Sequence, residues 1–430
     1  MSKNRILVGI DLGTSSVKVL AIDGSGQVRG RAKQGYNMYR PFPGWVQQSP
    51  TEWWNAVKQA LEMLGRQIDL SHTVGVGLSG QLNGLVMVDR AGNPLTDVPI
   101  WLDQRATEQS LFLAENWADA IQDIALGAPG PIHSLSKLLW YKDNEPQLIK
   151  DTHKILFPKD FITLRLTNRF ATDKSDAGAT LMLDLRKRDW AKAFLSELEI
   201  PLHILPTLHE SPDIVGTITS FGATETGLPR GIPVVAGAGD MGALAVGTGV
   251  TTPGTACTTI GTAGHIALHC DTFPERLDHR LWVMCHAVPG KYFWHGLVMT
   301  GGHSLAWFLN NFGEMEKAKA CSQKGNAYDL LLDEAAKVSA GSGGLIFLPF
   351  LDGAATPYHN SAAKASFIGA TSHTTKATFT RAVLEGVAYN FRDSFDLLAN
   401  LGYTVDNVTA GEGGSRHPLW PKIIADVLGI

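Results

Sequence analysis

A strand–turn–strand unit built on a Gly-Thr turn occurs twice in this chain. The turn Gly13-Thr14-Ser15 separates two apolar runs near the start, and Gly261-Thr262 separates two more past the middle. Short polar turns between apolar runs predict β-hairpins. Because the same unit recurs, we expect two related domains that face one cleft.

The chain has 430 residues, which predicts two to three domains with large cores. A net charge of −4 argues against nucleic acid or an anionic membrane as a partner. The stretch 231–250 carries one charge, but its glycines and Pro233 favour strand, loop and packed helix over a membrane span. The N-terminus shows no apolar targeting segment, so we expect a cytoplasmic protein.

The four cysteines are widely spaced and all lie in the second half of the chain. Their spacing fits neither a zinc site nor a disulfide framework. We expect buried free thiols in a reducing compartment. They are Cys257, Cys270, Cys285 and Cys321.

The first third of the chain reads as hairpin strands followed by alternating helices and strands. A third strand is expected near 28–33 and a buried strand over 73–78. Between them, Ser49-Pro50-Thr51-Glu52 predicts a capping box at the start of a helix that ends at Gly65. This order predicts an α/β fold, with domains over 1–248 and 249–430.

Two carboxylates follow predicted strands. Asp11, at the end of the first strand, is placed to hold hydrated Mg²⁺ beside a phosphate bound at the Gly-Thr turn. Asp240 follows an apolar strand and could accept a proton from a hydroxyl that attacks phosphorus. An ordinary polar hairpin and a helix-capping Asp240 remain open alternatives.

Three further segments could contribute to a binding site. Trp101 and Asp103 suit a sugar pocket, although Asp103 could instead cap a helix. The loop with Gln81 and Asn83 offers amides to hydroxyl groups, or is an ordinary loop. The turn at 413–414 opens a helix, where a nucleotide could approach the backbone. The chain contains no P-loop sequence.

In this order, the segments resemble the FGGY carbohydrate kinase family, and most closely its xylulokinase branch. The resemblance covers nearly the whole chain. Its segments are 9–18, 45–54, 79–84, 101–105, 172–175, 237–240, 261–264, 348–350 with 356–357, and 413–426.

The resemblance implies an α/β fold of two actin-like (ribonuclease H-like) domains with an interdomain catalytic cleft. It implies ATP-dependent phosphorylation of D-xylulose to D-xylulose 5-phosphate with Mg²⁺, Asp240 as general base, and Asp11 and Asp240 as catalytic and metal-associated carboxylates. The implied nucleotide-binding residues are Gly13, Thr14, Ser15, Lys18, Gly261, Thr262, Gly413 and Gly414. The implied substrate-binding residues are Gln81, Leu82, Asn83, Trp101, Asp103, Asp240 and Met241.

The chain departs from the family pattern at positions that form hydrogen bonds to substrate hydroxyl groups. Leu82 and Asn83 stand where the family loop usually has Met and His, and Met241 stands where Asn often follows the catalytic Asp. Ala354 and Ala355 replace a charged pair. A kinase for another ketose, a polyol or gluconate is therefore the alternative, followed by a non-catalytic regulator that binds sugar and nucleotide.

The resemblance also gives expectations for the end of the chain and for the molecules that it binds. Relatives continue with another strand and helix beyond the position of Ile430, so we expect the second domain to lack them. Sugar and ATP are the expected partners, without nucleic acid or membrane. Whether the chain forms a homodimer is left open by the sequence.

Overall fold

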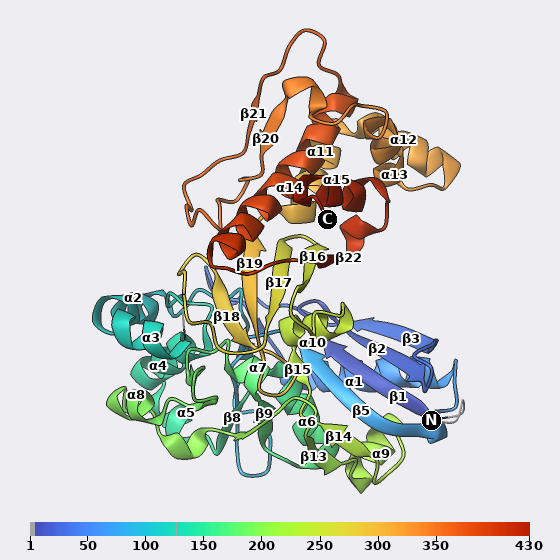
Figure 1. Cartoon of the computed structure of the whole chain (residues 1–430). Coiled ribbons are helices and arrows are strands. Elements are labelled where there is room, and N and C mark those ends of the chain that lie inside the picture. The colour runs from blue at the N-terminus through green and yellow to red at the C-terminus, as the bar shows by residue number, and fades with distance from the viewer. Residues whose placement is uncertain (1–4, 126) are drawn as a thin grey trace. The chain divides into compact units, whose positions relative to one another are not determined.

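The computed structural model describes residues 5–125 and 127–430 (Figure 1). Contacts divide the chain into two compact units. Unit 1 runs to Val246 and includes Met284–Lys291, and unit 2 comprises Gly247–Val283 and Tyr292–Ile430. Each unit contains its own β-sheet.

The seven-stranded sheet of unit 1 has the order β13-β14-β5-β1-β2-β3, and β15 also pairs with β5. β1, β2 and β3 form an antiparallel meander, whereas β14, β5 and β1 run parallel to one another, as do β15 and β5. The strands are β1 (Ile6–Leu12), β2 (Ser16–Asp23), β3 (Val28–Gly35), β5 (Thr73–Gly80), β13 (Ile214–Thr217), β14 (Pro233–Val235) and β15 (Ala238–Gly239). The predicted hairpin and the strands expected at 28–33 and 73–78 are therefore confirmed.

Helices and short strands surround this sheet. The helices are α1 (Pro50–Gly65), α2 (Thr107–Asn116), α3 (Ala118–Ala125), α4 (Ser134–Asn144), α5 (Pro146–Asp151), α6 (Pro158–Thr167), α7 (Lys174–Ala177), α8 (Lys192–Glu197), α9 (Ser220–Thr226) and α10 (Asp240–Gly247). The short strands are β4 (Gln47–Gln48), β6 (Val86–Val88), β7 (Val98–Pro99), β8 (Lys154–Leu156), β9 (Ala171–Asp173), β10 (Leu183–Asp184), β11 (Asp189–Trp190) and β12 (Thr207–His209).

Unit 2 has a main sheet with the order β18-β19-β17-β16-β22 and a separate two-stranded sheet of β20 and β21. Its strands are β16 (Thr255–Ile260), β17 (Gly264–Cys270), β19 (Tyr292–Val298), β20 (Ile346–Leu348), β21 (Ser366–Ile368) and β22 (Asn407–Gly411), and β18 (Trp282–Cys285) crosses the unit boundary in the chain. Its helices are α11 (Gly301–Phe312), α12 (Glu314–Gln323), α13 (Ala327–Ala335), α14 (Lys376–Asn400) and α15 (Leu419–Leu428). Figure 1 shows α15 beside the long helix α14, with which it is in contact.

The two sheets repeat one topology. In unit 1, β1 pairs antiparallel with β2 and parallel with β5. In unit 2, β16 likewise pairs antiparallel with β17 and parallel with β22. The repeated Gly-Thr turn of the sequence therefore marks a repeated α/β architecture, as expected of two actin-like domains.

The core of unit 1 forms where α1 packs on β2 and β3. Four apolar residues of α1 recur with helical spacing and are completely buried: Trp53, Val57, Leu61 and Leu64. The helix approaches β3 so closely that a Cβ atom at Gly30 would lie 2.8 Å from Leu64 Cδ1. Glycine at this position therefore allows the helix to seat on the sheet.

The predicted capping box at the start of α1 is wrong. The helix does begin at Pro50, but the Ser49 side chain forms no capping hydrogen bond. The Glu52 carboxylate instead accepts hydrogen bonds from the backbone N–H of Asn37, at 3.1 Å, and from the Tyr39 hydroxyl. Donors from the segment after β3 thus occupy the carboxylate that the capping box would have used.

The cysteine prediction holds for Cys257, Cys270 and Cys285, which are free and buried, whereas Cys321 is exposed. Cys321 lies on α12, a polar helix of which Ala320 is the buried residue, so its side chain stays at the surface. Among the described residues, no helix combines the length and apolar character that a membrane crossing requires.

Replacing Leu61 tests the packing of α1. Because its side chain is fully buried, Leu61→Ala should cost about 2–5 kcal/mol and lower the melting temperature of unit 1 by roughly 5–15 °C in calorimetry. Leu111→Ala is the matched control, since Leu111 is 56% exposed on α2. Equal melting temperatures for the two variants would contradict this account of the core.

Candidate functional site

Three predicted site segments leave the sheet of unit 1 at one edge. Asp11 on β1 lies opposite Ser79 on β5, and Ala238 on β15 lies opposite the same Ser79. Because these strands are parallel, their carboxyl ends meet at this edge. The structure therefore brings together Asp11, the loop that begins at Gln81, and Asp240.

The Gly-Thr turn is held by its carbonyl and hydroxyl groups. Thr14 accepts a hydrogen bond at its carbonyl from Gln48 Nε2, at 2.6 Å, and at its hydroxyl from the Trp101 indole, at 3.0 Å. The Tyr36 hydroxyl donates to the carbonyl of Gly13. Lys18 Nζ lies 3.1 Å from Asp11 Oδ2 across the hairpin. The predicted residues of this turn, with the exposed Ser15, thus form one compact group.

A buried amide, Gln48, connects this turn to the substrate loop. Its Oε1 accepts from the Trp53 indole at 3.1 Å and from Gln81 Nε2 at 2.9 Å, so its amide orientation is determined. The same orientation leaves Gln81 Oε1, a buried acceptor, without a hydrogen-bond partner among the described residues. Gln48 was not predicted as a site residue, although it lies two positions before α1 and within the segment 45–54 that carries the family resemblance.

The conformation of Asn83 is set by α4. Asn83 has a left-handed backbone with φ of 64°, which asparagine tolerates better than most residues. Its side-chain oxygen accepts from the N–H of Ser134 at 3.3 Å, which leaves the side-chain NH₂ as a donor. Its carbonyl accepts from Lys137 Nζ at 2.6 Å. Lys137 was not predicted from the sequence.

Lys137 is completely buried and also donates to the carbonyl of Ile132 at 2.8 Å. Burial lowers the pKa of Lys137 to about 7, an effect that the nearby Asp103 opposes and Arg105 supports. The side chain therefore stabilises the loop as a hydrogen-bond donor to two carbonyl groups.

Asp103 does not cap a helix, because α2 begins four residues later, at Thr107. Its buried carboxylate accepts from the N–H of Val46 at 2.6 Å and from Nε and Nη2 of Arg105, each at 2.9 Å. The guanidinium lies 3.7 Å from the centre of the Trp45 ring. This geometry favours a structural role for Asp103, whereas Trp101, 40% exposed, stays accessible.

Asp240 is the first residue of α10 and is half-buried, and Met241 after it is buried. The turn before it depends on Gly237, whose φ is 76° and where a Cβ atom would lie 2.2 Å from the carbonyl oxygen of Leu78. At Gly239, a Cβ atom would lie 2.3 Å from Leu82 Cδ2. The substrate loop and the segment that carries Asp240 are therefore in direct contact.

The predicted nucleotide residues of unit 2 also lie together. The carbonyl of Gly261 accepts from the N–H of Gly302 at 2.7 Å, and that of Thr262 from the N–H of His303 at 3.0 Å, both at the start of α11. A Cβ atom at Gly261 would overlap the Glu412 carboxylate. Since Gly413 and Gly414 follow Glu412, the two glycine turns are adjacent within this unit.

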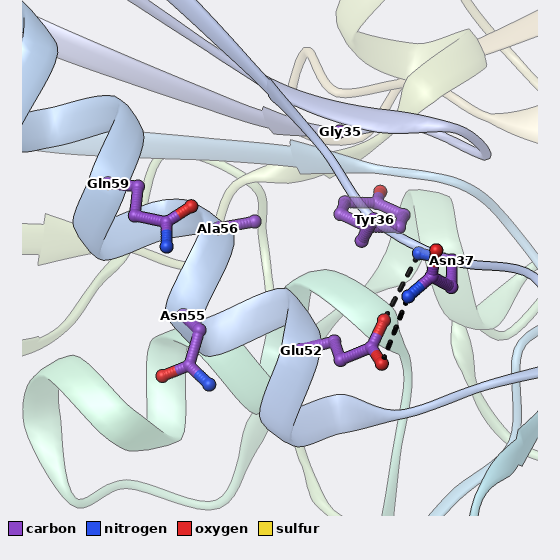
Figure 2. Close-up of a pocket in the computed structure, with 7 residues that line it drawn as sticks. All are labelled: Gly35, Tyr36, Asn37, Glu52, Asn55, Ala56 and Gln59. Atoms are coloured by element: carbon purple, nitrogen blue, oxygen red, sulfur yellow. Dashed lines mark hydrogen bonds between the residues drawn. The ribbon is translucent and has the colours of Figure 1, made fainter.

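A pocket of about 450 Å³ opens between the end of β3 and α1, outside the predicted site (Figure 2). Figure 2 shows Glu52 on α1 hydrogen bonded to Asn37. Tyr36 connects this pocket to the turn, because its hydroxyl bonds to Gly13. The lining residues are Gly35, Tyr36, Asn37, Glu52, Asn55, Ala56 and Gln59.

Comparison with known proteins gives matches over both units. Residues 6–247 match the model of the FGGY family of carbohydrate kinases, N-terminal domain, and residues 251–430 match the C-terminal domain of the same family. The chain is 32% identical to the xylulose kinase of Escherichia coli (strain K12), over 98% of this chain and 84% of that protein. It is 29% identical to glycerol kinase 2 of Saccharolobus solfataricus, over 99% and 84%.

The fold is also similar to solved structures. A crystal structure described as a xyloylose kinase from Brucella ovis superposes with a TM-score of 0.90 at 31% sequence identity. The match covers 99% of this chain and 86% of that one.

Lys137 predicts a pH dependence of stability. The folded chain loses the Lys137 proton near pH 7, whereas an unperturbed lysine titrates near 10.5. Between these values the unfolded chain binds more protons, so the free energy of unfolding rises with pH. Relative to Lys137→Met, we expect wild-type stability to rise by on the order of 1 kcal/mol per pH unit between pH 7 and 9 in denaturant titrations.

Lys150→Met is the control for this effect, because Lys150 is exposed on α5. It should keep the wild-type pH slope. If Lys137→Met also kept that slope, the buried lysine would not be its source.

Proposed function

Because the chain belongs to the FGGY family of carbohydrate kinases, we propose that it transfers the γ-phosphoryl group of ATP to a hydroxyl group of a sugar. The observation that carries this proposal is the shared edge of β1, β5 and β15. Asp11, the Gln81–Asn83 loop and Asp240 all leave the sheet there. Phosphoryl transfer needs a base, a phosphate cradle and a group that orients the acceptor, and these segments offer one of each.

Asp240 is the proposed general base. It accepts the proton of the sugar hydroxyl as the oxygen attacks the γ-phosphorus. The half-buried carboxylate lies at the start of a helix, where the N-terminal end favours negative charge.

Asp11 and Asp240 are the proposed magnesium-associated carboxylates. In the described residues, no group of three or more His, Cys, Asp or Glu side chains could hold a metal ion. Mg²⁺ bound by one or two carboxylates, water and nucleotide phosphates fits such a donor set. When bound, it would neutralise charge on the phosphates.

The proposed nucleotide-binding residues belong to the two Gly-Thr turns and to the glycine turn at 413–414. In unit 1 these residues are Gly13, Thr14, Ser15 and Lys18, and in unit 2 they are Gly261, Thr262, Gly413 and Gly414. The glycines allow phosphate oxygens to approach the backbone N–H groups. Lys18, held by Asp11 and largely exposed, adds a positive charge beside the turn.

D-xylulose is the proposed acceptor, and D-xylulose 5-phosphate the product. The similarity to the E. coli xylulose kinase over nearly the whole chain supports it. Gln81 Oε1 would accept a hydrogen bond from a sugar hydroxyl, and the Asn83 NH₂ group would donate one to a sugar oxygen. Another ketose, a polyol or gluconate is the alternative, and glycerol kinase 2 of S. solfataricus supports the polyol.

A coupled assay of ADP release tests the function directly. The acceptors are D-xylulose, D-ribulose, L-ribulose, xylitol, glycerol and D-gluconate, each with ATP and Mg²⁺. The highest kcat/KM is expected with D-xylulose. A higher kcat/KM with another acceptor would identify that acceptor as the substrate in place of D-xylulose. No turnover with any of them would contradict the kinase proposal.

Asp240→Asn tests the base. The amide has nearly the same shape but cannot accept the proton, so kcat should fall by at least about 100-fold. Sugar binding should remain measurable by calorimetry. Asp426→Asn, at an exposed position on α15, is the control and should keep wild-type kcat. Near-normal turnover in Asp240→Asn would show that Asp240 is not the general base.

Asn83→Asp tests the donor to the sugar. The substitution keeps the side-chain shape, tolerates the left-handed backbone and retains the acceptor for Ser134, but replaces the NH₂ donor with an oxygen. KM for the sugar should rise by roughly 10-fold or more, with a smaller change in kcat.

Asn168→Asp is the matched control for Asn83. Asn168 also has a left-handed backbone, with φ of 58°, but it is exposed at the end of α6. The KM of Asn168→Asp for the sugar should match that of the wild type. A KM for Asn83→Asp that equals the control value would show that Asn83 does not donate to the sugar.

A further inference from the structure

A buried ionic cluster surrounds Lys159 on α6. Its Nζ atom lies 2.5 Å from Asp160 Oδ1, 2.9 Å from Asp173 Oδ1 and 3.4 Å from Asp176 Oδ2, and these four side chains are at most 1% exposed. Burial disfavours the ammonium, but the three carboxylates keep the pKa of Lys159 above its ordinary value. We refer to these four residues as the Lys159 cluster.

The second oxygen of Asp173 extends the cluster to two serines. Asp173 Oδ2 accepts from the N–H of Ser175 at 2.8 Å, from the Ser175 hydroxyl at 2.5 Å and from the Ser211 hydroxyl at 2.7 Å. A hydroxyl has one proton to donate and two lone pairs. Because the Ser175 proton goes to Asp173, the Ser175 oxygen is left as an acceptor in a defined direction.

That acceptor holds the residue before Asp240. The backbone N–H of Gly239 donates to Ser175 Oγ at 3.1 Å, in a buried position. A buried N–H without an acceptor costs about 1–3 kcal/mol, so loss of this oxygen should displace the backbone or admit water. The chain of contacts Lys159–Asp173–Ser175–Gly239 thus ends at the attachment point of Asp240.

Close packing limits other positions for this segment. A Cβ atom at Gly242 would lie 3.0 Å from Ser175 Oγ, and one at Gly239 would lie 3.4 Å from Asp176 Cα. Gly239 and Gly242, on either side of Asp240, therefore pack against α7, which begins after Asp173. The hydrogen bond from Gly239 to Ser175 lies within this contact.

We infer that Ser175 is a positioning residue for Asp240, which it holds through the N–H of Gly239. The inference rests on the proposed function, in which Asp240 takes the proton of the sugar hydroxyl. A small displacement of a reacting group slows a chemical step much more than it weakens binding. Removing the hydroxyl should therefore lower kcat and leave KM nearly unchanged.

Ser175→Ala and Ser211→Ala form a matched pair. Both side chains are buried, and both hydroxyls donate to the same oxygen of Asp173, but only Ser175 accepts from Gly239. In the ADP-release assay, Ser175→Ala should lower kcat by roughly 10–100-fold, with KM for sugar and ATP within about threefold of wild type. Ser211→Ala should keep kcat within about twofold.

A double-variant cycle tests whether Ser175 acts through Asp240. If it does, Ser175→Ala should have little further effect on kcat in the Asp240→Asn background. Additive losses, or equal kcat values for Ser175→Ala and Ser211→Ala, would overturn the inference. If Ser175→Ala fails to fold, Ser175→Cys keeps a weaker acceptor and should show a kcat between those of wild type and Asp240→Asn. A wild-type kcat in that variant would also overturn it.

Amide hydrogen exchange gives a readout that does not depend on turnover. A peptide that covers residues 236–244 should exchange faster in Ser175→Ala than in Ser211→Ala or wild type, because the Gly239 N–H has lost its acceptor. Equal exchange in all three would overturn the inference whatever the enzyme phosphorylates. Faster exchange in a protein that turns over no sugar would instead contradict the proposed function alone.

Discussion

β5 pairs in parallel with β1 on one side and with β14 and β15 on the other, so a single strand sets the positions of Asp11 and Asp240. Side chains alternate between the faces of a sheet, and a shift of one residue would turn each of them to the opposite face. Hydrophobic residues on β5 and its neighbours oppose such a shift, because Val76 and Leu78 are buried in the core of unit 1. The energy that maintains the site edge is therefore mainly apolar burial.

Buried polar side chains then hold the loops that leave this edge. Gln48, Lys137 and Lys159 are each completely buried, which is costly unless hydrogen bonds or ion pairs compensate. Gln48 and Lys137 have partners 33 to 54 positions away in the chain, whereas Lys159 is paired with Asp160, Asp173 and Asp176. Among the described residues, several buried acceptors still have no hydrogen-bond partner, and they include both oxygens of Asp176 and, in the loop proposed to bind sugar, Gln81 Oε1.

Local patterns predicted elements more reliably than side-chain partners. The hairpin and α1 follow from apolar spacing, which acts over a few residues and does not depend on the rest of the fold. The capping box failed because Glu52 met stronger donors in the segment after β3. Asp103 failed as a cap because α2 begins only at Thr107, and its carboxylate instead binds the nearby Arg105 and the distant Val46. For Glu52, and in part for Asp103, a bond to a residue distant in the chain took the place of the predicted local one.

The amino-acid sequence by itself determined the repeated hairpin, the helix after Pro50, the carboxylate that follows an apolar strand and the resemblance to the FGGY family, because these depend on short patterns or on the order of segments. Only the tertiary structure decided the roles of Lys137 and Ser175. Their partners, Asn83 and Gly239, lie 54 and 64 positions away in the chain. No periodicity links such residues, since the hydrogen bond forms only after packing of the intervening helices and strands has brought donor and acceptor within 3.1 Å.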